Sequence, residues 1–78
     1  MNRTYGDAVY STSPVQDSQQ GYTGLELYRV RQNKRKRMAS ILFWDASGQF
    51  SVETFKSDVP LDILEELIAE AKNAIKTG

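Results

Sequence analysis

Apolar residues recur at two different periods along this chain, and the period changes near Asp58. Before that point, residues 25–31, 36–44 and 49–55 combine β-branched and aromatic residues with partial alternation, which is typical of β-strands. Beyond it the apolar spacing becomes three or four, as on one face of a helix: Leu64, Leu67, Ile68, Ala71 and Ile75. The pattern therefore predicts three strands followed by one helix.

Two turn signals separate the predicted strands. Residues 45–48 place Asp first and Gly last, as a type I turn prefers. Residues 32–35 predict the other reversal, because Asn33 tolerates a left-handed backbone. The second strand ends in residues 41–44, which are apolar on both faces, and such a strand usually lies centrally in a sheet. We expect a three-stranded antiparallel meander.

The helix has clear boundary signals. Asp58 is a good N-cap residue, and Pro60 suits the first turn. Acidic residues cluster near the start and basic residues near the end, as the helix dipole favours: Asp62, Glu65 and Glu66, then Lys72 and Lys76. We predict a helix from about Pro60 to Lys76, packed on one face of the sheet. The fold class is then α+β.

Residues 1–23 differ in composition from the rest. They are rich in Ser, Thr, Gln, Asp, Gly and Tyr and contain few aliphatic residues, which favours a flexible polar N-terminal leader. An alternative is that residues 8–12 form a short edge strand ended by Pro14, which would make the sheet four-stranded. The predicted organisation is a leader over residues 1–23 and a β-β-β-α domain over residues 24–78.

Composition argues against an enzyme. The 78 residues include no Cys and no His, so disulfides, the usual ligands of zinc or haem, and the commonest general base are missing. We expect no catalytic residues, metal site, cofactor or small-molecule substrate. The longest apolar run, residues 41–44, is far shorter than the roughly 20 residues of a membrane span. With no apolar signal-peptide core either, a cytoplasmic protein without membrane contact is the expectation.

The charge distribution identifies a candidate binding site. Six of the ten basic residues lie within residues 29–37, which contain no acid, although the net charge of the chain is zero. Such a patch attracts polyanions. The candidate nucleic-acid contacts are Arg29, Arg31, Lys34, Arg35, Lys36 and Arg37, with Tyr28 and Trp44 as candidates for stacking on bases. The alternative is a solvated hairpin whose charges prevent pairing with another chain.

A single helix covers a single face of the sheet, so the other face needs a partner. A second copy of the chain is a natural one, and we expect a homodimer with Phe43, Trp44 and Phe55 at its interface. The alternative is that these side chains are half exposed at the rim of the sheet. A protein-interaction module with no nucleic-acid role is the second function class. It would use an acidic helix face that complements the basic hairpin: Asp62, Glu65, Glu66 and Glu70.

Short motifs carry a resemblance to single-stranded nucleic-acid binders. Residues 30–38 (VRQNKRKRM) are similar to the Pur-alpha repeat, which carries a basic strand, then a Gln-Asn turn, then a basic residue that opens the next strand. Residues 44–50 (WDASGQF) and 59–61 (VPL) resemble the positive-coactivator family of single-stranded-DNA binders. The resemblance implies a dimeric module that holds single-stranded DNA or RNA on a basic sheet surface. Both families place four strands before the helix, and the hairpin glycine expected beside the basic residues is missing here.

Overall fold

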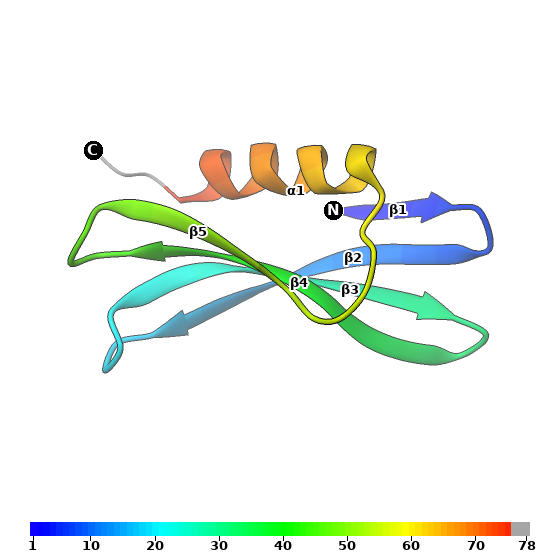
Figure 1. The fold of residues 1–78 in the computed structure, drawn as a ribbon, viewed down its shortest axis with the longest axis horizontal. Helices are drawn as coiled ribbons and strands as arrows, with labels where there is room; N and C mark the ends of the chain where they lie inside the picture. Colours follow the sequence, from blue (N-terminus) through cyan, green and yellow to red (C-terminus); the bar gives the residue numbers. More distant parts are fainter. Residues whose placement is uncertain (76–78) are drawn as a thin grey trace.

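The structure is a computed structural model that describes residues 1–75. The elements of this part of the chain are β1 (Asn2–Tyr5), β2 (Ala8–Asp17), β3 (Tyr22–Arg31), β4 (Lys34–Trp44), β5 (Gln49–Thr54) and α1 (Leu61–Ala74) (Figure 1). The strands form one open antiparallel sheet in the order β1-β2-β3-β4-β5. The α+β class, with an antiparallel sheet followed by a C-terminal helix, is confirmed.

The number of strands was predicted wrongly. β1 and β2 are formed by residues that we expected to be a flexible leader, so the sheet has five strands within residues 1–75 rather than three or four. Thr, Tyr and Val suit a half-buried pleated surface even without aliphatic neighbours, and Tyr10 is only 2% exposed. Pro14 does not end β2. It lies beyond Ser11, the last residue of β2 that pairs with β1, and a sheet edge tolerates a proline.

The turn between β3 and β4 is tighter than predicted. Its loop consists of Gln32 and Asn33 alone, because Arg31 pairs with Lys34 across the ladder. Both loop residues have positive φ, 51° and 62°, as a type I′ turn requires. This turn matches the right-handed twist of the two strands, and it places Lys34 and Arg35 in β4 rather than in the turn.

The predicted helix boundaries need one correction. Asp58 is not the N-cap; Pro60 occupies that position with extended backbone angles, and no side chain caps the helix start within the described residues. A residue that precedes a proline favours an extended backbone. Val59, which precedes Pro60, and the residues before it therefore stay outside the helix. The helix ends at Ala74, and Lys76 lies outside the described residues.

The core lies between α1 and the central strands. Helix α1 runs along one side of the sheet (Figure 1) and contacts β3 and β4. The buried apolar cluster joins three helix residues to the sheet: Ile63, Leu67 and Ala71 with Ala8, Tyr10, Leu25, Leu27, Met38, Ala39 and Ile41. Burial of apolar surface contributes about 25 cal/mol per Å², so burial of this cluster stabilises the packing of α1 on the sheet.

A β-bulge interrupts the pairing of β3 with β4. Leu27 pairs with Ala39, and Tyr28 pairs with Arg37, which leaves Met38 without a partner on β3. Met38 and Ala39 are consecutive yet both fully buried. A bulge of this kind shifts the side-chain alternation of one strand by one residue. The residues of β4 before Met38 and those after it therefore alternate in opposite senses between the two faces of the sheet.

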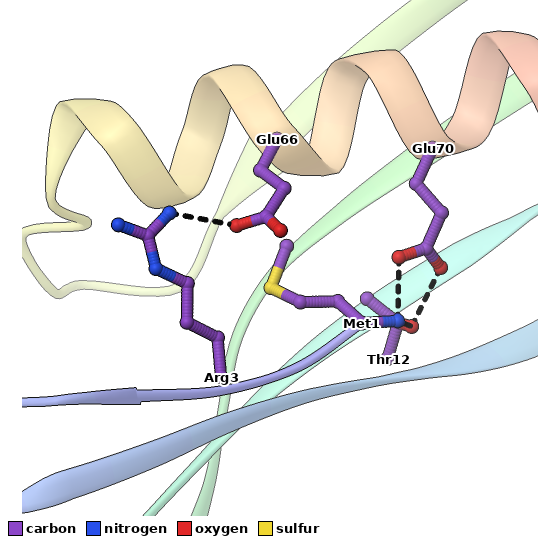
Figure 2. Close-up of polar contacts among 5 residues, drawn as sticks. All are labelled: Met1, Arg3, Thr12, Glu66 and Glu70. Atoms are coloured by element: carbon purple, nitrogen blue, oxygen red, sulfur yellow. Dashed lines mark hydrogen bonds and ion pairs between the residues drawn. The ribbon is translucent and has the colours of Figure 1, made fainter.

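Polar contacts join α1 to the N-terminal strands (Figure 2). Glu70 accepts a hydrogen bond from the Thr12 hydroxyl at 2.7 Å and pairs with the ammonium group of Met1, while Arg3 pairs with Glu66 at 2.8 Å. Burial acts to raise the pKa of Glu70, but the hydrogen bonds from Met1 and Thr12 and the ammonium charge together hold that pKa below its ordinary value. Glu70 is therefore ionised and attached to the N-terminal residue and to β2.

Gly24 should not tolerate a side chain. A Cβ at this position would lie 2.0 Å from the carbonyl oxygen of Ile41 and 2.9 Å from Cδ2 of Leu42. We expect Gly24→Ala to lower the free energy of unfolding by at least about 3 kcal/mol, measured by chemical denaturation. Gly48→Ala is the control, because that position has a φ of 66° but no atom within 4 Å of the added Cβ. It should cost only about 1 kcal/mol; equal losses would contradict the steric explanation.

Glu70 should make stability depend on acidic pH. Because its pKa is lower in the folded state, its stabilising effect is complete above the ordinary value of 4.5 and disappears as pH falls through the folded-state pKa. We expect Glu70→Gln to cost about 1 kcal/mol at neutral pH and progressively less in acid, measured by urea denaturation across pH. Glu66→Gln, which removes an exposed ion pair, should cost less than about 0.5 kcal/mol. A cost of Glu70→Gln that does not change with pH would refute this account.

Candidate nucleic-acid interface

The bulge at Met38 determines which basic residues share a face with Tyr28. Uninterrupted alternation would place Arg37 on the same face as Ala39 and Ile41, toward α1. Instead Arg37 pairs with Tyr28, and Arg35 pairs with Val30. These four residues lie on the sheet face opposite α1, which we call the outer face.

Two arginines on the outer face stack on aromatic rings. The guanidinium carbon of Arg35 lies 3.7 Å from the centre of the Tyr28 ring, and that of Arg37 lies 4.2 Å from the centre of the Phe55 ring. Both distances fall within the roughly 6 Å range of cation–π interactions. The structure thus brings together three of the predicted site residues, Tyr28, Arg35 and Arg37, and adds Phe55.

Glu26 connects these residues and was missed in the sequence. Its carboxylate accepts a hydrogen bond from the Tyr28 hydroxyl at 2.8 Å and one from the Arg37 guanidinium at 2.9 Å. The hydrogen bond to Glu26 is the largest cause that raises the pKa of Tyr28; burial and the charge of Glu26 add to it, while Arg35 and Arg37 oppose it. Tyr28 therefore remains a neutral phenol. Strand alternation puts Glu26 and Tyr28 on one face, and this was the signal in the sequence that could have identified Glu26.

The other four cations of the cluster lie on the opposite face of the hairpin. Arg29 pairs with Lys36, and Arg31 pairs with Lys34, on the face that also carries Leu25 and Leu27. Arg31 forms an ion pair with Asp7 at 3.0 Å. Within residues 1–75, the members of the cluster that form no ion pair are Arg29, Lys34, Arg35 and Lys36. The six predicted cations are thus held on one hairpin but divided between its two faces.

Trp44 lies far from this group. It packs edge-on against Tyr22, with ring centres 5.2 Å apart, and its indole N–H donates to Ser51. Tyr22 is six residues from Tyr28 along β3, or about 20 Å of extended strand. The two predicted stacking residues, Tyr28 and Trp44, therefore belong to opposite ends of the sheet.

The predicted dimer-interface residues lie on different faces. Trp44 pairs with Tyr22 on the outer face, and Phe55 lies beneath Arg37 there. Phe43 points to the other face, where its ring lies 5.1 Å from that of Phe50. Only Trp44 and Phe55 are thus available together to a partner on the outer face.

The described part of the chain offers little for small-molecule or metal chemistry. Residues 1–75 form no pocket, and they contain no group of three acidic, His or Cys side chains that could hold a metal ion. None of the helices described is long and apolar enough to cross a membrane. No family model matches the chain, and comparison with the curated proteins and with the solved structures also gave no match.

Proposed function

We propose that this chain is a non-enzymatic module that binds single-stranded nucleic acid, DNA or RNA, through the β3–β4 hairpin. The observation that carries the proposal is the stacked pair of Arg35 and Tyr28 on the outer face, next to Arg37 on Phe55. A guanidinium plane and an aromatic ring are both surfaces on which an unpaired base stacks. A duplex hides the faces of its bases, so this arrangement favours single strands.

The charges of the hairpin support the same proposal. Lys34, Arg35 and Lys36 are exposed and form no ion pair within residues 1–75, so they are available to phosphate groups. The rest of the chain carries an excess of acidic residues, which confines the attraction for a polyanion to the hairpin. The resemblance of residues 30–38 to the Pur-alpha repeat points to the same ligand.

A salt titration tests the proposal. Labelled single-stranded oligonucleotides of about 12 nucleotides and duplexes of equal length are titrated with protein at about 50 to 200 mM salt, with fluorescence anisotropy as the readout. We expect binding to the single strands that weakens steeply with salt. Arg35→Glu should weaken it by about tenfold, because it reverses a phosphate contact and removes the stack on Tyr28.

Lys72→Glu is the matched control. It makes the same change in net charge at an exposed position on α1, in the last turn of the helix. It should change affinity by less than about twofold, since nonspecific charge effects are small at this salt. Equal losses in the two variants, or no binding at low salt, would contradict the proposal.

Homodimerisation through the outer face is a second candidate role. The observation that favours it is the edge-on pair of Tyr22 and Trp44, which α1 leaves uncovered on that face. A symmetric pair of such patches would bury both aromatic side chains. This end of the sheet is distant from Arg35, so a dimer would leave the hairpin accessible.

Light scattering at micromolar concentration tests the dimer. We expect a molar mass near twice the 8.8 kDa of one chain. Trp44→Asp should return the mass to that of a monomer, because it places a charge in an apolar contact. A mass near 8.8 kDa for the unmodified protein would refute the dimer and leave the nucleic-acid proposal untouched.

A further inference from the structure

The outer face has an ordered sequence of cross-strand rows. The row nearest the hairpin loop contains Val30 and Arg35, and the next contains Tyr28 and Arg37. The third row crosses four strands and carries two acids: Ser13, Glu26, Ser40 and Glu53. The positive end of the outer face is therefore bounded by a negative row.

Glu26 is the member of this row that touches the candidate site. Its side chain is 19% exposed, whereas that of its partner Arg37 is 49% exposed. The ion pair uses one terminal nitrogen of the guanidinium, at 2.9 Å. The carboxylate of Glu26 thus holds Arg37 on the outer face, while about half of the Arg37 side chain stays open to solvent.

We propose that Glu26 is an internal competitor for phosphate, which lowers the affinity of the hairpin and ends the bound strand at the row of Tyr28 and Arg37. The inference rests on the proposed function. A carboxylate and a phosphate are alternative acceptors for the same guanidinium donors, so a strand that engages Arg37 fully must displace Glu26. An ion pair whose arginine is half exposed costs little free energy to break, which makes Glu26 a modulator of affinity rather than a block.

The acidic row also sets the direction of the bound strand. A nucleic-acid strand that followed β3 toward Trp44 would bring its phosphates over Glu26 and Glu53, whose negative charges would repel them. A strand that crosses the hairpin along the row of Tyr28 and Arg37, toward Phe55, stays beside the acidic row and meets cations and aromatic rings. The binding site is therefore short and lies across β3 and β4.

Glu26→Gln tests the competition. The variant keeps an acceptor oxygen for the Tyr28 hydroxyl but removes the charge that holds Arg37. We expect its affinity for labelled oligothymidylate to rise about threefold, which corresponds to the free energy of a partly exposed ion pair. The plot of log affinity against log salt should steepen by about 0.7, since one further phosphate is neutralised. The pKa of Tyr28 should fall in the same variant, measured by carbon NMR of labelled tyrosine.

Glu66→Gln is the matched control, because Glu66 forms an equivalent pair with Arg3 at 2.8 Å on the other side of the molecule. It should leave both affinity and salt dependence unchanged. Arg37→Gln provides a second measurement: it should reduce affinity more in the Glu26→Gln background than in the unmodified protein, because Glu26 masks Arg37 in the latter. Thermal unfolding followed by circular dichroism verifies that each variant is folded.

The possible results separate the two proposals. Binding by the unmodified protein, with equal or weaker binding by a folded Glu26→Gln variant, overturns the competition while the proposed function stands. An increase in affinity without a steeper salt dependence also overturns it, since Arg37 would then not gain a phosphate. Absence of binding by both proteins overturns the proposed function and this inference together.

Discussion

The β-bulge at Met38 is the constraint on which the candidate site depends. On one side of it, β4 alternates so that Ala39 and Ile41 enter the core with Leu27. On the other side the alternation is reversed, and Arg37 lies beside Tyr28 on the outer face. Burial of Met38 stabilises the bulge, because its side chain fills space in the core. The apolar core thus determines the position of the cationic site.

The strongest sequence patterns predicted the corresponding elements correctly. The alternating segments 25–31, 36–44 and 49–55 correspond to β3, β4 and β5, and the spacing of Leu64, Leu67 and Ala71 corresponds to α1. β1 was missed, and β2 was foreseen only as the alternative of a short edge strand over residues 8–12, because their Ser, Thr and Tyr residues lack the aliphatic alternation that marks a strand. The division of the cations between two faces could not be predicted, for a different reason. A bulge leaves no signal in a local pattern, since its stability comes from packing between distant segments.

Two arginine–glutamate pairs in this molecule show how context changes the meaning of one interaction. Arg3 and Glu66 join β1 to α1 at the surface, where an exposed pair adds little to stability. Arg37 and Glu26 have nearly the same geometry, but both partners also engage aromatic side chains, directly or through a hydroxyl. The second pair therefore links the two cation–π contacts of the outer face through Glu26, whereas the first only joins β1 to α1.

The order of the strands in the sheet has a consequence for how the chain folds. Because every strand pairs with its neighbour in sequence, each hairpin closes a short loop. The entropy cost of loop closure is therefore small for each hairpin. Folding of a β-protein is slow mainly when its pairings are distant in sequence, so this meander should form rapidly for its class. The contacts of Arg3 with Glu66 and of Thr12 with Glu70 span 63 and 58 residues. We expect the hairpins to form first and the helix to dock against the first strands afterwards, because these contacts require the longest loop to close.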